Sequence, residues 1–391
     1  MRKIAATGLA TLAVVSAAVF GTAGAAHAVM TAAQNELSGV SCVSAKHCVA
    51  VGSSTNAKTG AGTALARIWN GTKWSAVAVR LPAGADDSVL LGVSCMSASY
   101  CVAIGAYAKS SGANAPTNAF AVTWNGTGWT AVTLPKPATG APVTIPTSVS
   151  CAAAGKCLAI GMYGTVSGNP RPLAWSLAGT TWTDRKPPAP AGTQSALLTG
   201  VSCGSASFCV LAGEASGKAS SSTLLDSWNG TSFALMKPAI PAGDALVVLS
   251  TVSCASATSC TALGSGISMT NPNSPPGLAE RWNGKAWSAA RLPAAASRLD
   301  LAGISCPTAT RCVAAGANAN RAAAMSYNGK AWTVTSVPAP AKGTIEVFHS
   351  VSCLSATVCV AVGQSGPANG STSADLAGFW NGKSWKLVTT S

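Results

Sequence analysis

The chain has 391 residues, a formal charge of +14 and only 9% charged side chains. Because no run of lysine or arginine is present, this composition argues against a nucleic-acid-binding protein, although the positive excess leaves acidic polymers open as partners. Length does not give a domain count here, because a repeat of about fifty residues fills the chain.

The amino terminus reads as a secretory signal peptide over residues 1–28. Arg2 and Lys3 form a basic start, an apolar stretch follows, and Ala26-His27-Ala28 is typical of a cleavage site. An uncleaved membrane anchor is the alternative. No second stretch of spanning length occurs, so we expect a secreted, extracellular protein without stable membrane insertion, with residues 29–36 as a lead-in.

Seven copies of one sequence motif follow. The motif consists of a Ser-Cys pair, five residues, a second Cys, and a short apolar run that ends in Gly. An even number of cysteines at fixed local spacing predicts disulfides in an exported protein, whereas the spacing does not suit tetrahedral zinc. Each pair is expected to form a disulfide that joins the two strands of a hairpin. The predicted disulfides are Cys42–Cys48, Cys95–Cys101, Cys151–Cys157, Cys203–Cys209, Cys254–Cys260, Cys306–Cys312 and Cys353–Cys359.

Each repeat is predicted to contain four strands, which in the first copy are 37–42, 48–52, 64–69 and 72–81. Asn70-Gly71 separates the last two. This dipeptide favours a two-residue type I′ turn, which would pair Trp69 with Thr72 and place Trp74 diagonal to Trp69 on the same face. The third repeat lacks the dipeptide. Proline-containing linkers follow each fourth strand and are expected to end it.

Aromatic residues stand before this turn and five positions later in six of the repeats. Rings reused at one position in every unit usually pack unit against unit, and we interpret them as core, with sugar stacking as the alternative. The pairs are Trp69 and Trp74, Trp124 and Trp129, Trp228 and Phe233, Trp282 and Trp287, Tyr327 and Trp332, and Trp380 and Trp385.

Seven units of four short antiparallel strands predict an all-β fold, a seven-bladed β-propeller with one hairpin disulfide per blade. The repeats lie near 37–84, 85–141, 142–193, 194–244, 245–296, 297–343 and 344–391. Independent disulfide-bonded units on a string are the alternative. Closure by a strand taken from the other terminus is not evident, although residues 31–36 offer a partial one.

The run Val360-Ala361-Val362-Gly363, followed by Phe379-Trp380-Asn381-Gly382-Lys383-Ser384-Trp385, resembles the repeats of Asp-box (BNR) propellers and of the photosystem II assembly factor type of propeller. The likeness covers nearly all of residues 37–391. It departs at Trp380, which occupies the position of the Asp-box aspartate. The resemblance therefore implies the fold of a secreted bacterial propeller and does not extend to sialidase activity.

The acidic residues hold no shared position in the repeats, as judged from the sequence. They are Glu36, Asp86, Asp87, Asp184, Glu214, Asp226, Asp244, Glu280, Asp300, Glu346 and Asp375. No catalytic motif is present, so we predict no catalytic residue. The alternative is an extracellular carbohydrate-active enzyme, a glycosidase or lyase, with its site assembled at the ring centre.

The hypothesis that the sequence favours is a binding or scaffold module. Segments between the second and third strands vary most in length, and variable loops on a rigid scaffold commonly bind ligands. The candidate binding residues are Asn56, Asn114, Asn118, Asn169, Arg171, Asn271, Asn273, Asn318, Arg321 and Gln364. We expect an extracellular glycan or protein as partner, a monomer, and no cofactor, metal or nucleic acid.

Overall fold

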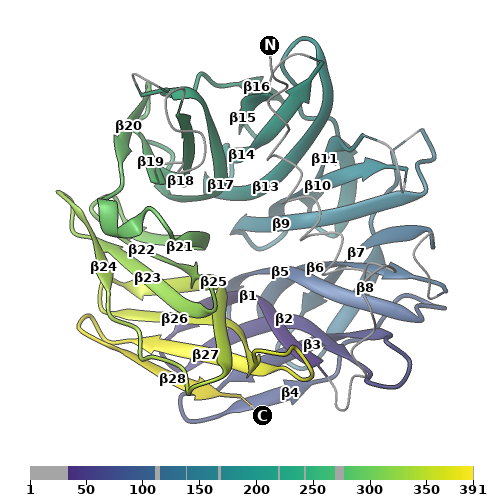
Figure 1. Cartoon of the computed structure of the whole chain (residues 1–391). Coiled ribbons are helices and arrows are strands. Elements are labelled where there is room, and N and C mark those ends of the chain that lie inside the picture. Colours follow the sequence, from purple (N-terminus) through teal and green to yellow (C-terminus); the bar gives the residue numbers. More distant parts are fainter. Residues whose placement is uncertain are drawn as a thin grey trace.

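A computed structural model describes residues 34–110, 115–137, 139–165, 169–218, 221–241, 244–268 and 277–390. The expected signal peptide therefore lies outside the described residues. The described chain forms four-stranded antiparallel units arranged in a ring (Figure 1). The prediction of a seven-bladed β-propeller is confirmed. No helix of the described chain is long and apolar enough to cross a membrane.

The strands of the first four blades follow the repeats of the sequence. Blade 1 comprises β1 (Gln34–Ser44), β2 (His47–Thr55), β3 (Gly62–Trp69) and β4 (Trp74–Val77). Blade 2 comprises β5 (Asp87–Ser97), β6 (Tyr100–Ala108), β7 (Thr117–Trp124) and β8 (Trp129–Thr133). Blade 3 comprises β9 (Val143–Ala153), β10 (Lys156–Gly164), β11 (Arg171–Ala178) and β12 (Thr181–Arg185). Blade 4 comprises β13 (Thr193–Ser205), β14 (Phe208–Gly217), β15 (Ser221–Trp228) and β16 (Phe233–Leu235).

The remaining three blades have the same order of strands. Blade 5 comprises β17 (Asp244–Ser256), β18 (Ser259–Ser268), β19 (Gly277–Trp282) and β20 (Trp287–Arg291), and a short 3-10 helix, η2 (Ala294–Ala296), follows it. Blade 6 comprises β21 (Asp300–Thr308), β22 (Arg311–Asn318), β23 (Arg321–Tyr327) and β24 (Trp332–Thr335). Blade 7 comprises β25 (Thr344–Ser355), β26 (Val358–Pro367), β27 (Ala374–Trp380) and β28 (Trp385–Thr389).

All seven predicted disulfides are confirmed, and each joins the first two strands of one blade. Cys42 and Cys48 are direct partners in the ladder between β1 and β2, with their Cα atoms 4.0 Å apart. The other six bonds link cysteines at the same sequence separation of 6. Disulfides of this number are typical of proteins from oxidising compartments.

The prediction of a two-residue turn at Asn-Gly is wrong. Trp69 pairs directly with Trp74, so the loop spans four residues and the two rings are opposite rather than diagonal. Asn70 Oδ1 accepts hydrogen bonds from the backbone N–H groups of Thr72 and Lys73. Only Gly71 has a positive φ, +96°. The asparagine side chain caps the loop, which a type I′ geometry would not need.

The predicted fourth strand, 72–81, is too long, since β4 ends at Val77. Beyond that residue the chain leaves the sheet and crosses to the next blade. Val79 and Leu81 pack there against the core that blade 2 contributes. Apolar residues that read as a continuing strand are therefore contacts between blades.

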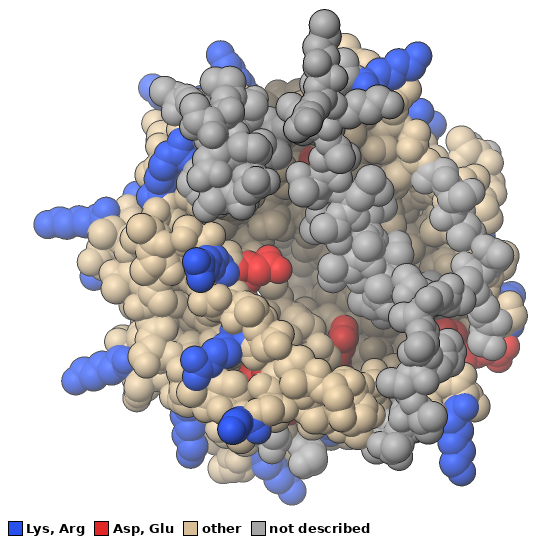
Figure 2. All heavy atoms as spheres, viewed as in Figure 1, with Lys and Arg blue, Asp and Glu red and all other residues tan. Residues whose placement is uncertain are grey.

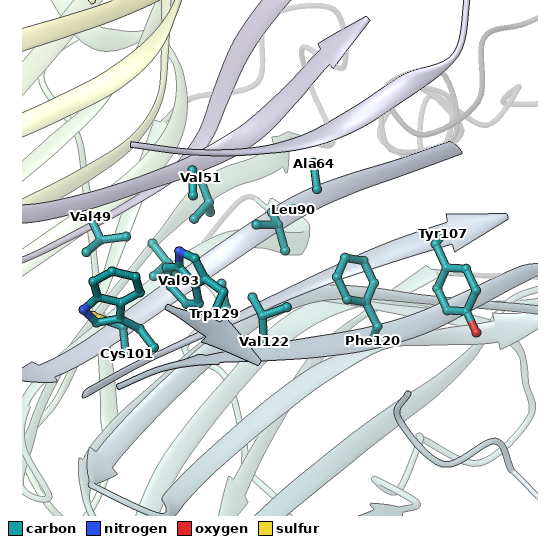
Figure 3. Packing of buried hydrophobic residues seen from close by; sticks show 13 residues of the cluster. Val49, Val51, Ala64, Leu90, Val93, Cys101, Tyr107, Phe120, Val122 and Trp129 are labelled. Atoms are coloured by element: carbon teal, nitrogen blue, oxygen red, sulfur yellow. The ribbon is translucent and has the colours of Figure 1, made fainter. Parts of the chain in front are cut away.

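The core lies between neighbouring blades rather than within one. In Figure 3, Val49 and Val51 of β2 face Leu90, Phe120 and other residues of blade 2 across the interface. Similar clusters occupy the other interfaces, and each includes aromatic residues of the repeat. The interpretation of the aromatics as packing between units is borne out for most of them.

The serine before the first cysteine of each repeat links neighbouring blades. Ser41 Oγ accepts a hydrogen bond from the backbone N–H of Cys95 at 2.9 Å. The same bond recurs with lengths of 2.8–3.0 Å between Ser94 and Cys151, Ser150 and Cys203, Ser202 and Cys254, Ser253 and Cys306, Ser305 and Cys353, and Ser352 and Cys42. The Ser-Cys pair therefore supplies a disulfide within its own blade and hydrogen bonds to the blades on either side.

The ring closes without exchange of a strand. Residues 34–36 belong to β1, which pairs with β2 of its own blade, and β28 pairs with β27. Pairing of β-type between blades 1 and 7 is limited in the described chain to a parallel bridge between Gln34 and Ser373, and a shared hydrophobic cluster and the Ser352 bond complete the seam. The Arg67 guanidinium and the Asp375 carboxylate add an ion pair of 2.5 Å across the same seam.

Candidate functional site

The two ends of the ring differ in what they present. Trp69 Nε1 donates a hydrogen bond to the backbone oxygen of Ala45, so the cysteine turn and the asparagine turn of a blade lie side by side. Because the strands are antiparallel, the segments between the second and third strands lie at the opposite end with the linkers between blades. We call this opposite end the loop face.

The first strands of the blades surround the ring axis and leave a narrow cavity of about 220 Å³. Glycine permits this close approach, because a Cβ on Gly39 would lie 3.1 Å from Gly92 Cα of the next blade. Threonine hydroxyls bridge strands here, as Thr147 Oγ1 does by donating to the backbone oxygen of Leu198 at 2.7 Å. The cavity lining thus consists mainly of small and aliphatic residues, with His349 among them, and its hydroxyls are partly used by the scaffold.

Carboxylates occur where the inner strands begin, at the loop face. Glu36, Asp300 and Glu346 stand near the start of β1, β21 and β25, which belong to three consecutive blades around the ring. Figure 2 shows acidic side chains inside the central hollow, while most lysines and arginines point outward from the rim. A positively charged protein therefore carries acidic groups at the mouth of its channel. We call Glu36, Asp300 and Glu346 the mouth carboxylates.

Two oxygen atoms near this mouth are buried without a hydrogen-bond partner in the described chain. They are Glu346 Oε2 and Asn35 Oδ1, from neighbouring inner strands. Burial raises the pKa of Glu346 above its ordinary value. Glu36 differs, because Ser38 Oγ donates to its Oε1 at 3.3 Å. Unfilled acceptors beside an opening can receive donors from a ligand.

The conclusion that acids hold no shared position is wrong. Glu36 and Asp300 each stand six residues before the first cysteine of their repeats, and counting back from that cysteine would have found the match. The shared position was missed because the acidic residues are distributed over the whole chain. The ring brings the two positions to one end of the channel.

A second shared position lies two residues before the aromatic that ends the third strand. Asp226 of β15 and Glu280 of β19 occupy it in adjacent blades, and Arg67 of β3 occupies it in blade 1. Both acids are fully buried. Burial raises the pKa of Asp226 to about 8 and that of Glu280 to about 7. Because they lie sealed between blades, these acids cannot reach a substrate in this conformation.

The environments of these two acids differ. Glu280 Oε2 accepts a hydrogen bond at 2.9 Å from the backbone N–H of Ala239, in the linker of the preceding blade. Neither oxygen of Asp226 has a hydrogen-bond partner. Glu280 therefore holds the linker in place by a hydrogen bond. Asp226 is buried without a partner, and this burial keeps its carboxyl neutral near pH 7.

Several predicted binding residues lie on the loop face, in different settings. Asn56 Oδ1 accepts hydrogen bonds from the N–H groups of Lys58 and Thr59, so this side chain caps its own loop. Asn169 and Arg171 are exposed at the start of β11, and Asn118 is half-buried within β7. Asn114, Asn271 and Asn273 lie outside the described residues.

Two of the predicted residues lie close to Glu346, and a third lies on the other face of the same blade. Asn318 pairs with Arg321 where β22 turns into β23, and both are exposed. The backbone oxygen of Asn320, inside that turn, accepts a hydrogen bond from Glu346 N–H at 3.1 Å. Gln364 pairs with Val347, the residue after Glu346, so its side chain lies on the opposite face of blade 7. The fold thus brings amide, guanidinium and carboxylate groups of blades 6 and 7 together beside the channel mouth.

No group of three or more His, Cys, Asp or Glu side chains that could hold a metal ion occurs among the residues described here. The mouth carboxylates are spread over separate strands. Their arrangement suits several hydrogen bonds to one extended ligand better than a single coordination centre.

No family model matches the chain, and no curated protein matches it. Several solved structures do match the fold of the chain. YCF48 bound to D1 peptide superposes with a TM-score of 0.50 at 12% identity, covering 84% of this chain and 90% of that one. The fold is shared.

Enzymes have the same architecture. The GH74 xyloglucanase from Xanthomonas campestris gives a TM-score of 0.53 at 14% identity, covering 92% of this chain and 55% of the enzyme. The acylaminoacyl peptidase of Pyrococcus horikoshii gives 0.51 at 7% identity, covering 93% and 53%. The resemblance to the photosystem II assembly factor type of propeller is confirmed as a likeness of fold. Proteins that bind and proteins that catalyse share this ring, so function has to be argued from the site.

Proposed function

We propose that the protein is a non-catalytic extracellular binding module, exported by residues 1–28, that holds an extracellular glycan or protein on its loop face. Chemistry at the channel mouth favours a glycan. The observation that carries the proposal is the gathering of the mouth carboxylates beside the amide and guanidinium groups of blade 6.

Hydroxyl groups of a sugar are donors that suit these acceptors. Glu346 Oε2 and Asn35 Oδ1 are buried and unpaired, so a donor that reaches them removes the cost of two unsatisfied groups. Arg321 and Asn318 stand within the same region and provide donors to ring oxygens or carbonyl groups of the ligand. Neutral partners of this kind bind without a need for charge pairing.

Placement on inner strands gives these groups a rigid support. Glu346 stands in β25, whose ladder to β26 continues through Cys353 and Cys359. The disulfide and the serine link hold this strand against its neighbours. Side chains on such a frame lose little further freedom when they bind, which favours affinity.

The test uses the full secreted chain in a glycan-binding assay with purified cell-wall polysaccharides and chitooligosaccharides. The variants are Glu346→Gln, which keeps the shape and removes the charge, and Asp184→Asn in β12 as a matched control. We expect binding to at least one glycan that weakens about 10-fold to 150-fold in Glu346→Gln, from a charged hydrogen bond of about 1.5–3 kcal/mol.

Three results decide against the glycan. Capture of a protein from culture medium with no glycan bound would assign the face to a protein partner. Equal binding by both variants would move the site away from the mouth. Turnover of a glycoside panel, lost in Glu346→Gln, would instead establish an enzyme with its site at the ring centre.

A further inference from the structure

The outer surface of the seam between blades 7 and 1 has a groove of about 440 Å³. Such a volume falls within the range of ligand sites, about 300–1,000 Å³. Its lining, which we call the seam groove, consists of Trp69, Thr72, Lys73, Trp74, Phe379, Lys386, Val388 and Thr390. It lies among the outer strands β3, β4, β27 and β28, on the outside of the ring.

The aromatic pair in this groove is less covered than its counterparts. Trp69 and Trp74 are both half-exposed, whereas at least one residue at the equivalent positions is buried in every other blade. The Trp69 ring lies 5.6 Å from Trp74 and 4.9 Å from Phe379, centroid to centroid. Three rings therefore form one accessible aromatic surface.

At the other interfaces the chain itself covers this surface. The residue five positions after the second aromatic position of one blade lies at the start of the linker that meets the next blade. In chain order these residues are Val79, Leu134, Pro187, Pro238, Leu292 and Val337. Val79 packs against the cluster that contains Trp124 and Trp129, Leu134 belongs to the cluster of Trp182, and Leu292 to that of Tyr327. Ala239 and Val337 pack in the same way at two further interfaces, so a proline-containing linker occupies the equivalent site at five of them.

Linker backbone groups take part in this docking as well. Trp175 Nε1 donates to the backbone oxygen of Pro135 at 2.8 Å, and Ala239 N–H donates to Glu280 Oε2. The extended backbone of a linker therefore accepts a hydrogen bond from an indole N–H of the next blade and donates one to a carboxylate of the next blade. The mode resembles the recognition of proline-rich segments on aromatic grooves.

At the seam the corresponding residue is Thr390, and the described chain places no linker residue over Trp69 and Trp74. Val388 beside it is 37% exposed. Lys73 and Lys386 stand on the groove lining, and neither forms an ion pair within the described chain. The groove is therefore apolar at its floor and cationic at its rim.

We propose that the seam groove docks an extended proline-containing segment of a partner protein that carries carboxylates on both sides of its apolar residues. The apolar and proline residues take the place that linkers take at five of the other interfaces. The flanking carboxylates pair with Lys73 and Lys386, which gives the segment its charge preference.

The probe is a fluorescent peptide with the sequence of residues 335–340, Thr-Ser-Val-Pro-Ala-Pro, with an aspartate added at each end. Its binding to the full chain is followed by anisotropy. We expect saturable binding that falls about 5-fold to 10-fold in the double variant Lys73→Glu with Lys386→Glu, since each exposed charge contributes modestly. Lys285→Glu with Lys330→Glu, in turns of blades 5 and 6, is the matched control and is expected to bind normally.

A second peptide with lysine at each end separates docking from a general loss of fold. It is expected to bind the double glutamate variant more tightly than the wild type, which a misfolded protein cannot do. Trp74→Ala is expected to abolish binding of the aspartate peptide, while Trp332→Ala, at the same position in blade 6, retains it.

Several outcomes would overturn the proposal. One is the absence of peptide binding by the wild type at millimolar concentration. Another is equal binding by the two lysine double variants. A third is tighter binding of uronic-acid oligosaccharides at the same residues, which would make the groove a site for acidic glycans.

Discussion

The hydroxyl oxygen of Ser352 accepts a hydrogen bond from the backbone N–H of Cys42 at 3.0 Å, across the seam where the last blade meets the first. These residues are 310 positions apart in the sequence. The bond is chemically the same as the six that join consecutive blades. The ring is therefore closed by the same device that builds it.

Replacement of Ser352 by alanine is expected to lower the free energy of unfolding by about 1–2 kcal/mol, because the Cys42 N–H loses its acceptor. Denaturant titration measures the change. Ser202→Ala, which removes the equivalent acceptor for Cys254 within the array, is the comparison. Unaltered stability in both variants would show that the hydroxyls do not link the blades.

Each hairpin disulfide is expected to contribute about 2 kcal/mol, the chain-entropy estimate for a closed loop of this length. Replacement of Cys254 and Cys260 together by alanine therefore lowers the melting temperature, and full reduction lowers it much further. Calorimetry with and without reductant provides the measurement. A melting curve that reductant leaves unchanged would contradict a structural role for the bonds.

The ion pair of Arg67 with Asp375 is buried at the seam, so removal of one partner leaves an uncompensated charge. We expect Arg67→Met to cost about 3–5 kcal/mol of unfolding free energy. Adding Asp375→Leu should restore most of the loss, which a double-mutant cycle detects. Equal destabilisation by the single and double variants would mean that packing of the arginine, rather than its charge, matters.

Asp226 is expected to make the folded state less stable as pH rises. Its pKa increases from an ordinary 3.8 to about 8 on folding, so between these values the folded protein keeps a proton that the unfolded chain releases. Stability contributed by this group therefore falls with rising pH, by up to about 1.4 kcal/mol per pH unit, and levels off above pH 8.

The variant Asp226→Asn tests this sign, with Asp184→Asn as control. Compared with wild type, Asp226→Asn should gain a little stability at pH 5 and clearly more at pH 8, as measured by urea unfolding at both values. A gain of the same size at both pH values would exclude ionisation as the cause.

Particular residues show how far the sequence could be interpreted. Cys42 and Cys48 lie six positions apart, so local geometry alone fixed their pairing. Trp69 and Trp74 were correctly placed on one face of one hairpin, but they were predicted to be diagonal, because their register depended on the Asn70 side chain capping the loop. The four-residue loop with its asparagine cap competes with a two-residue type I′ turn. Residue propensities favour Asn-Gly in both and do not say which one forms.

The amino-acid sequence by itself determined the blade, because its strands, hairpins and disulfides depend on contacts between residues a few positions apart. Only the tertiary structure decided what the ring assembles. Glu36 and Glu346 reach one channel mouth, and Trp69 meets Phe379 at one seam, although about 310 residues separate each pair. Contacts over that distance require a closed ring, and the number and curvature of the packed blades set that closure rather than any local pattern.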